Sequence, residues 1–294
     1  MRRQLPLTVE EVLKVDNKLV LLFGDVGTYG FRFAQAKFPD RVYNVGILEQ
    51  SMMSMAAGLA MQGFIPVVHT ISAFLVERAF EQIKNDFGYQ GLGGNFIGTG
   101  VSYDMVSWGC THQCPADVGV LKNIPGMEIV VPGTPAEFDS LFKQSYRDGR
   151  PTYFRMSFRS NAVSHDVVFG KALVVKTGAR ATVIAVGPMR ERVEEACKDL
   201  DVTILYYTTV APFDGDTLRE NLQGGKLFVC EPYYSGACAV DIAAATGLRP
   251  VAVTYIGIPL EFPHHYGTLD ELDAFFRLTA DDIRTRMKSA LRPL

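Results

Sequence analysis

Residues 44–75 read NVGILEQSMMSMAAGLAMQGFIPVVHTISAFL, and the fold class follows from this pattern. A short apolar strand is predicted at residues 42–45, and apolar residues then recur at helical spacing over residues 49–62. Residues 65–69 form a continuous, largely apolar run, as expected of a buried strand. A strand, a helix and a second strand predict a βαβ unit with parallel strands. Glu49 follows the first strand and heads the helix, so it is placed at the carboxyl edge of the sheet, where α/β folds bind ligands.

The alternation of strands and helices continues on both sides of this unit. In the first half we expect further strands at residues 19–23, 95–98, 128–131 and 152–155, and helices at residues 74–87 and 135–147. In the second half we expect strands at residues 181–186, 202–206, 226–231 and 250–255, and helices at residues 190–198, 216–222 and 236–246. Residues 157–176 lack helical periodicity and are predicted to be a connector. The pattern predicts an α/β fold of two domains, each with a mainly parallel sheet covered by helices.

Two short helices are predicted to close the chain. Thr268 and Glu271 have the spacing of a capping box, and Thr279 with Asp282 is a weaker version of the same signal.

The composition is typical of a globular protein, and it argues against binding to nucleic acids or to a membrane surface. The 294 residues are 48% hydrophobic and 21% charged, with a net charge of −3. No long run of Lys or Arg is present, which argues against a nucleic-acid surface and a basic membrane patch. No apolar run approaches the ~18 residues that span a bilayer, and no signal peptide is expected. Five cysteines favour free thiols over a disulfide framework, so we expect a cytoplasmic protein.

Several motifs lack the spacing that their apparent chemistry requires. Asp214-Gly-Asp216 followed by Asn221 has the wrong order and spacing for a magnesium-diphosphate motif, and we interpret it as a turn entering a helix. His112 lies between Cys110 and Cys114, but their spacing is not that of a zinc site. We therefore predict no metal site in this chain.

Glu49 has two interpretations when it is considered alone. A glutamate in the first turn of a helix most often complements the helix dipole. Here the helix is apolar on most faces, so the carboxylate is expected to be partly desolvated. A carboxylate in that environment favours proton sharing, which makes Glu49 a catalytic candidate.

Motifs in both halves of the chain form a specific set. In the first half these are Gly46-Ile-Leu-Glu49 with Ala56-Ala-Gly58, Thr111-His-Gln113, and Ile124-Pro-Gly-Met127 leading to Pro132. In the second half they are Thr182–Gly187, the turn at Pro212 and Val229-Cys-Glu231. The set resembles the C-terminal half of the transketolase family over essentially the whole chain. The resemblance implies a pyrimidine-binding domain of thiamine-diphosphate enzymes over residues 1–165 and a transketolase C-terminal domain over residues 166–294.

The resemblance assigns cofactor-binding roles to five residues. Glu49 aligns with the glutamate that hydrogen-bonds the aminopyrimidine nitrogen of thiamine diphosphate. Phe74 matches an aromatic residue that stacks on the pyrimidine, and Ile71 occupies a second position that is aromatic in transketolases. Asp25 and Val26 match an Ala-Asp-Leu loop that meets the cofactor.

The resemblance also places residues toward the substrate. His112 matches the histidine that faces the reacting carbon and exchanges a proton with substrate oxygen or stabilises developing charge. Trp108 stands where sugar-specific transketolases have an aspartate, and Gly100 where they have a phosphate-binding histidine. A phosphate-binding arginine falls one position before Arg159, which is a candidate to replace it. His69 is a further candidate, with a backbone-bonded structural role as the alternative. These departures suggest an acceptor that is not an ordinary sugar phosphate.

The resemblance implies a partner subunit. The family binds the cofactor's diphosphate and Mg²⁺ with another domain, whose motif is absent from this sequence. We therefore expect a split enzyme, in which an N-terminal transketolase-like subunit supplies the metal ligands. Because the family's sites lie between subunits, an α2β2 heterotetramer is expected. A fragment of a longer protein would have the same sequence pattern.

Several functions stay open at this point. The first is a transketolase-like transferase that moves a two-carbon ketol unit, or a related acyl-carbanion unit, to an acceptor. The alternatives are a 2-oxo acid dehydrogenase E1 β-subunit, a 1-deoxyxylulose-phosphate-synthase-like enzyme, and a non-catalytic interaction subunit. The Thr111-His-Gln113 segment favours the first over the E1 β-subunit.

Overall fold

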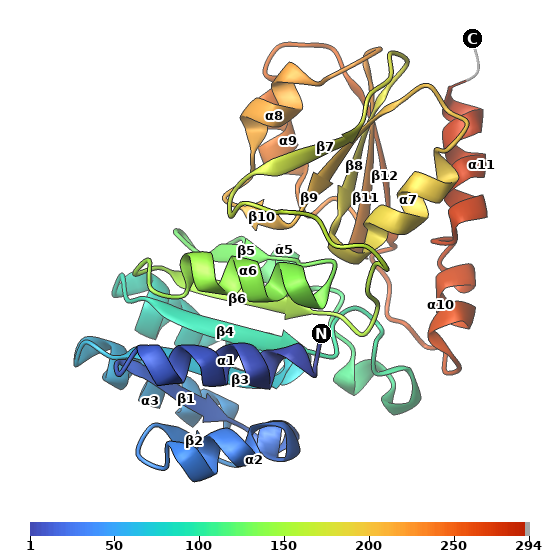
Figure 1. Ribbon diagram of the computed structural model, residues 1–294. Helices are drawn as coiled ribbons and strands as arrows, with labels where there is room; N and C mark the ends of the chain where they lie inside the picture. Colours follow the sequence, from blue (N-terminus) through green and yellow to red (C-terminus); the bar gives the residue numbers. More distant parts are fainter. Residues whose placement is uncertain (292–294) are drawn as a thin grey trace.

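Seven strands form the N-terminal sheet of the computed structural model, which describes residues 1–291 (Figure 1). The order across the sheet is β10-β5-β6-β4-β3-β1-β2, and every neighbouring pair is parallel except β10 with β5. Its strands are β1 (Leu19–Phe23), β2 (Val42–Asn44), β3 (Ile65–Ile71), β4 (Gly94–Thr99), β5 (Glu128–Val130), β6 (Pro151–Met156) and β10 (Thr209–Ala211). The predicted parallel sheet is confirmed.

Helices cover both faces of this sheet. One face carries α1 (Gln4–Val15), α2 (Thr28–Lys37) and α6 (Pro135–Ser145), and the other carries α3 (Glu49–Met61) and α5 (Asp117–Leu121). Alternating side chains of β1 belong to the apolar cores on the two faces of the sheet, because successive residues of a strand point to opposite faces. Leu19, Leu21 and Phe23 pack with the first group of helices, whereas Val20 and Leu22 pack with the second.

The sequence analysis missed α1 and α2. α1 buries Leu5, Val9 and Val12, but it has Pro6 in its first turn and begins without a side-chain cap. α2 also lacks a side-chain cap, and it buries only Phe31 and Ala34. Both helices therefore lack the capping signal at their start, and α2 also lacks a broad apolar stripe.

The helix expected at residues 74–87 is present but irregular. π-helical turns at Ala73–Arg78 and Ile83–Tyr89 flank a single α-helical turn, α4 (Phe80–Gln82). A π turn takes one more residue than an α turn, so it changes the direction in which the side chains project. Phe74 and Arg78 both lie in the first of these turns, next to the carboxyl end of β3.

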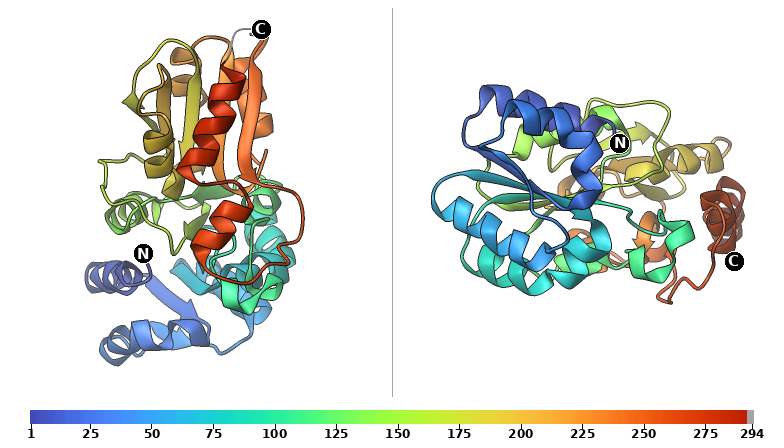
Figure 2. Two further views of the ribbon diagram at one scale, coloured as in Figure 1. Left: turned by 90° about the vertical axis from the view of Figure 1, so that its right-hand side faces the viewer. Right: turned by 90° about the horizontal axis from the view of Figure 1, so that it is seen from below.

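The C-terminal half contains a five-stranded sheet with the order β12-β11-β8-β9-β7. Its strands are β7 (Ala172–Lys176), β8 (Thr182–Val186), β9 (Thr203–Tyr207), β11 (Lys226–Tyr234) and β12 (Ala252–Ile258). α8 (Gly215–Glu220) and α9 (Ala239–Thr246) cover one face. The other face carries α7 (Arg190–Ala196), α10 (Leu269–Phe275) and α11 (Ala280–Ala290), and Figure 2 shows α11 along the side of this sheet. The two expected caps are confirmed, since Thr268 and Glu271 form a capping box and the Thr279 side chain accepts from the Asp282 N–H.

The prediction that residues 157–176 form only a connector was wrong at its end. Residues 172–176 form β7, which pairs antiparallel with β9 at the sheet edge. Residues 172–175 are an apolar run, but it is short, and the strand is only half buried at the edge of the sheet.

The two halves share buried contacts. β10 belongs to the C-terminal part of the chain but pairs with β5 of the N-terminal sheet. A continuous apolar core extends from α3 and β3 to β8, β9 and α9. The boundary between residues 165 and 166 stays a prediction. Within residues 1–291, no helix has both the length and the apolar character needed to cross a membrane.

Candidate functional site

Glu49 is a buried carboxylate at the start of α3. Its side chain is only 2% exposed, although carboxylates are almost never fully buried without a partner. Thr70 at the end of β3 lies with its hydroxyl 3.4 Å from Oε1, and Nη1 of Arg78 lies 2.7 Å from Oε2. The carboxylate is therefore at the carboxyl edge of the sheet, as predicted. It is paired with the Arg78 guanidinium, which lies between it and solvent.

Arg78 connects this carboxylate to a group of three rings. The Phe74 ring is 5.0 Å from the His112 ring in an edge-to-face arrangement, and the Trp108 ring is 4.7 Å from His112 on another side. The guanidinium carbon of Arg78 lies 4.2 Å from the centroid of the Phe74 ring. Trp108 is 61% exposed, so the group forms an aromatic surface that opens to solvent. We call Glu49, Phe74, His112 and Trp108 the Glu49 cluster.

A glycine allows His112 and Trp108 to approach. Two short 3₁₀ turns, Val106–Trp108 and Cys110–His112, are joined by Gly109 at φ +71°. The positive φ of Gly109 disfavours any residue with a side chain, and a Cβ there would also require the exposed Tyr266 ring to move. The Thr111 hydroxyl is 2.9 Å from Nδ1 of His112 and fixes the orientation of the imidazole.

The other predicted cofactor residues also lie at strand ends. Asp25 and Val26 follow β1 in a 3₁₀ turn, where the exposed Asp25 carboxylate accepts a hydrogen bond of 3.2 Å from Asn44. Ile71 ends β3 and is half buried. The structure thus brings the ends of β1 and β3 to the same edge as Glu49, since these strands are parallel neighbours.

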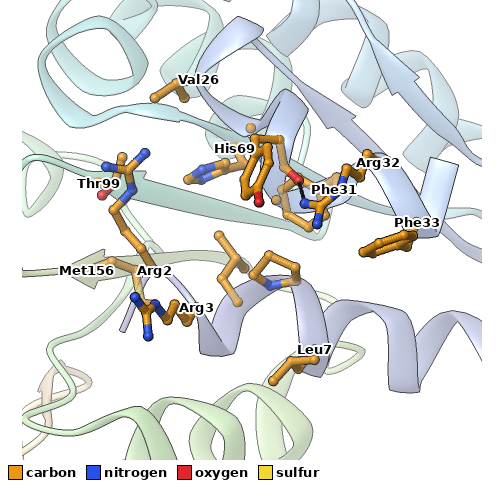
Figure 3. Close-up of a pocket in the computed structure, with 15 residues that line it drawn as sticks. Arg2, Arg3, Leu7, Val26, Phe31, Arg32, Phe33, His69, Thr99 and Met156 are labelled. Carbon is orange, nitrogen blue, oxygen red and sulfur yellow. Dashed lines mark hydrogen bonds between the residues drawn. The ribbon is translucent and has the colours of Figure 1, made fainter.

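A cavity of about 530 Å³ opens at this edge between α1 and α2 (Figure 3). Val26, His69 and Thr99 line it together with three arginines, Arg2, Arg3 and Arg32. The cavity is also lined by aromatic and aliphatic side chains, among them Tyr29, Phe31, Phe33, Leu5 and Met156. Figure 3 shows Arg2, His69 and Thr99 at one end of the cavity and Phe33 at the other. A volume of this size is typical of a small-molecule site.

Two buried polar groups at this end have unused hydrogen-bonding capacity. Nδ1 of His69 donates to the Ile97 carbonyl at 2.8 Å, which leaves Nε2 as an acceptor. Burial, with a smaller contribution from the nearby Arg2 guanidinium, lowers the pKa of His69 to about 4, although the hydrogen bond to the Ile97 carbonyl acts in the opposite direction. The Thr99 hydroxyl is buried and has no hydrogen-bond partner. The backbone contact expected as the structural alternative for His69 is therefore present, and the same ring also lines the cavity.

The remaining substrate candidates have different surroundings. Gly100 has φ +73°, and a Cβ there would lie 2.8 Å from the Met105 side chain, so the position excludes a larger residue. The Arg159 guanidinium forms ion pairs with Asp270 and, at 2.6 Å, with Asp273 of α10. Arg159 is therefore directed toward the C-terminal half, and its substrate role stays a prediction.

The motifs set aside in the sequence have structural roles. The Asp214 side chain accepts from the backbone N–H of Thr217 at 3.2 Å, so it caps α8 and the interpretation as a turn is confirmed. The Cys114 thiol is buried and donates to Glu77 at 3.5 Å, whereas Cys110 is exposed. Within residues 1–291, no group of three or more His, Cys, Asp or Glu side chains is arranged to hold a metal ion.

The sequence analysis missed two residues of the site. Arg78 contacts both Glu49 and Phe74, and its position four residues after Phe74 is a signal for a cation over a ring. Arg2 faces His69 and lies over the Phe158 ring at 5.7 Å. Nothing in its sequence spacing indicates this position, because it depends on how α1 packs on the sheet.

Comparison with known proteins identifies the family. Residues 1–162 match the model of the transketolase pyrimidine binding domain, and residues 170–283 match that of the transketolase C-terminal domain. A protein of Rhodococcoides fascians described as an uncharacterized 33.6 kDa protein in the fasciation locus is 37% identical over 97% of this chain and 92% of its own length. A 6-deoxy-6-sulfo-D-fructose transketolase subunit, SqwH of Clostridium sp. (strain MSTE9), is 29% identical over 93% of this chain and 88% of its own. A solved structure titled split gene transketolase, inactive beta4 tetramer, superposes with a TM-score of 0.88 at 28% identity over 99% of this chain and 97% of its own. The chain belongs to the transketolase family and comprises the pyrimidine-binding and C-terminal domains of that family.

Proposed function

We propose that this chain is the C-terminal subunit of a split thiamine-diphosphate-dependent transferase. It moves a two-carbon ketol unit, or a related acyl-carbanion unit, to an acceptor. The observation that carries the proposal is the buried Glu49 carboxylate at the carboxyl edge of a parallel sheet, linked through Arg78 to the Phe74 ring, which in turn contacts His112.

The residues of the Glu49 cluster fit the aminopyrimidine of this cofactor. Glu49 is nine-tenths buried or more, yet its nearest cation is a side chain that reaches it from solvent. Phe74 offers a flat apolar contact for a planar ring. Thiamine diphosphate, when bound, supplies the carbanion chemistry. With the cofactor bound, Glu49 would share a proton with the ring nitrogen, and Asp25, Val26 and Ile71 are proposed to contact the cofactor from the neighbouring strand ends.

His112 is assigned the proton exchange with substrate oxygen. Its ring is partly exposed, is oriented by Thr111 and lies between Phe74 and Trp108. An imidazole in this position can donate to a developing oxyanion or accept a proton from a hydroxyl. Trp108 then forms one wall of the acceptor position.

The cavity beside α1 supports a substrate with an anionic group. Arg2 supplies positive charge at the end of the cavity where the Nε2 acceptor of His69 and the unpartnered Thr99 hydroxyl lie. A guanidinium recognises carboxylate, sulfonate or phosphate groups, and Nε2 accepts from a hydroxyl. The aromatic and aliphatic wall adds apolar contact, so we propose an anionic, hydroxylated substrate. Gly100, Trp108 and Arg159 remain proposed substrate residues.

A partner subunit is proposed to complete the site with the diphosphate-binding domain and Mg²⁺. The exposed side of α3 and the loop before it present Ile47, Leu48, Met55 and Met61, and α3 contains no charged residue except the buried Glu49. Such an uncharged apolar surface next to the catalytic candidate is typical of an interface. Relatives described as a transketolase subunit and as a split gene transketolase that is an inactive beta4 tetramer support this proposal. We propose an α2β2 assembly and, from its unpaired thiols, a cytoplasmic location.

The proposal is tested with the assembled enzyme. The tagged chain is purified from its native cells with thiamine diphosphate and magnesium, and stoichiometric partners are identified by mass spectrometry. Ketose phosphates and 2-oxo acids are then screened as donors, because release of carbon dioxide points away from simple ketol transfer.

Glu49→Gln is expected to reduce turnover by about 10²- to 10⁴-fold. Glu81→Gln, an exposed glutamate of α4, is the matched control. Unchanged activity of Glu49→Gln would favour the non-catalytic interaction subunit.

A further inference from the structure

Arg78 contacts the two groups that the proposed function assigns to the aminopyrimidine. Its Nη1 is 2.7 Å from Oε2 of Glu49, and its guanidinium carbon is 4.2 Å from the centroid of the Phe74 ring. The Arg78 side chain is 43% exposed, whereas that of Glu49 is 2% exposed. The guanidinium therefore covers a buried carboxylate from the solvent side.

A guanidinium and an aminopyrimidine have the same recognition features. Both are planar and both stack on an aromatic face. The guanidinium donates N–H groups to the Glu49 carboxylate, and the ring nitrogen of an aminopyrimidine would share a proton with the same carboxyl group. Within residues 1–291, the other polar group that contacts the Glu49 carboxylate is the Thr70 hydroxyl, at the longer distance of 3.4 Å. A cofactor ring that bonds Oε2 and stacks on Phe74 would therefore compete with Arg78 for the same contacts.

We propose that Arg78 occupies the aminopyrimidine position in the free chain and leaves it when the cofactor binds. This inference rests on the proposed function. The partly exposed Arg78 side chain can move into water, so the cofactor ring can replace it without a change of the backbone. Arg78 is thus a residue that controls cofactor loading. It also balances the charge of Glu49 while no cofactor is present, because a buried carboxylate without a partner is costly.

Occupation by Arg78 lowers the apparent affinity for the ring. When only a fraction of molecules has the position open, the apparent dissociation constant rises by the reciprocal of that fraction. If Arg78 is in place in about nine of ten molecules, its removal strengthens binding about tenfold. If Arg78 instead supports the bound ring, its removal weakens binding.

The test uses the purified chain and the free pyrimidine 4-amino-5-hydroxymethyl-2-methylpyrimidine, which requires neither the diphosphate-binding domain nor a metal. The sequence has one tryptophan, Trp108, whose ring is 4.7 Å from that of His112, so its fluorescence reports on this position. The variants are Arg78→Met, which keeps an aliphatic stem, and Arg78→Lys, which keeps the charge without the plane. The matched control is Arg147→Met, since Arg147 also lies over an aromatic ring, that of Tyr146, but outside the cavity and the Glu49 cluster.

Arg78→Met is expected to bind the pyrimidine about tenfold tighter than the wild type. The affinity of Arg78→Lys should lie between the two, and that of Arg147→Met should equal the wild-type value. Urea unfolding of each variant establishes that it is folded. If Arg78→Met does not fold, the affinity of Arg78→Lys decides the test. Equal, weaker or undetectable binding by the Arg78 variants would overturn the role of Arg78. A double variant, Arg78→Met with Glu49→Gln, tests the proposed function separately. If it binds the pyrimidine as tightly as Arg78→Met alone, Glu49 does not bind the ring, which contradicts the proposed function.

Discussion

Arg155 and Asp117 form an ion pair from which solvent is excluded, with Nε of the arginine 2.8 Å from Oδ2 of the aspartate and neither side chain exposed. The Tyr153 hydroxyl donates to the same carboxylate oxygen at 2.9 Å, and Nη2 of Arg155 donates to the Ser102 hydroxyl at 2.9 Å. Ser102 in turn pairs with Cys114 through two backbone hydrogen bonds. The pair therefore anchors both ends of the segment that carries Trp108 and His112.

Breaking this pair is predicted to destabilise the protein strongly. Asp117→Asn removes the carboxylate that is paired with the buried Arg155 guanidinium, so the free energy of unfolding should fall by about 3–5 kcal/mol. Replacing both residues, by Arg155→Met with Asp117→Leu, should cost less than the sum of the single changes. Urea denaturation measures both effects. Asp199→Asn removes the more exposed pair with Arg284 and should cost less than about 1 kcal/mol. Similar losses for the two single aspartate variants would contradict the prediction.

Trp108 is predicted to contribute to acceptor binding and little to stability. Its ring contacts His112 but is mostly exposed, so Trp108→Ala should leave the unfolding midpoint nearly unchanged. Loss of one aromatic contact of about 0.5–1.5 kcal/mol would lower kcat/KM for the acceptor about 2- to 12-fold. Initial rates of the assembled enzyme at varied acceptor concentration measure this change. Tyr89→Ala, which removes another exposed aromatic side chain, is the control and should keep wild-type kcat/KM.

Arg2 is predicted to select anionic substrates. Arg2→Ala removes a charged partner from the cavity, and hydrogen bonds to charged groups contribute about 1.5–3 kcal/mol, so kcat/KM should fall about 10- to 150-fold. The loss should appear with anionic substrates and not with neutral analogues of the same shape. Arg147→Ala serves as the control because Arg147 lies over Tyr146, outside the cavity. An equal loss for anionic and neutral substrates would show that Arg2 acts only through the fold.

His69 is predicted to make stability depend on pH. Its folded pKa of about 4 lies below the ordinary value of 6.5, so the unfolded chain binds more protons between these values. The stabilising contribution is complete above pH 6.5 and is lost as the pH falls toward 4. The loss amounts to about 3 kcal/mol at 1.36 kcal/mol per pKa unit. His69→Gln should lack this component. Urea unfolding of both proteins at several pH values checks it, and parallel pH curves would refute it.

The fold class was predictable because its signals are local. Buried strands such as β1 and β8 appear as continuous apolar runs, and α3 follows β2 with clear helical spacing. α1, α2 and β7 were missed because tertiary packing on a sheet face or edge determines them more than their own pattern.

The candidate site was predictable only in part. The positions of Glu49 at the start of α3 and of Phe74 next to the carboxyl end of β3 follow from the motifs and the parallel topology. The contact of Arg78 with Glu49 depends on the π-helical turn, and the position of Arg2 depends on the packing of α1. Such contacts join elements whose relative orientation is set in three dimensions, so no spacing along the chain reveals them.

The pairing of β10 with β5 means that the two halves cannot be separated cleanly at the connector. A fragment ending near residue 165 would lack the strand that closes its sheet, and β5 would expose unpaired backbone groups to neighbouring molecules. Such a fragment is expected to aggregate or to recruit a foreign strand. A chain cut by protease within residues 157–170, by contrast, should stay associated as a nicked protein, because β10 still bridges the two pieces. Cooperative unfolding is therefore expected to span the whole molecule, and the first domain should fold on its own only when residues 209–211 are supplied with it.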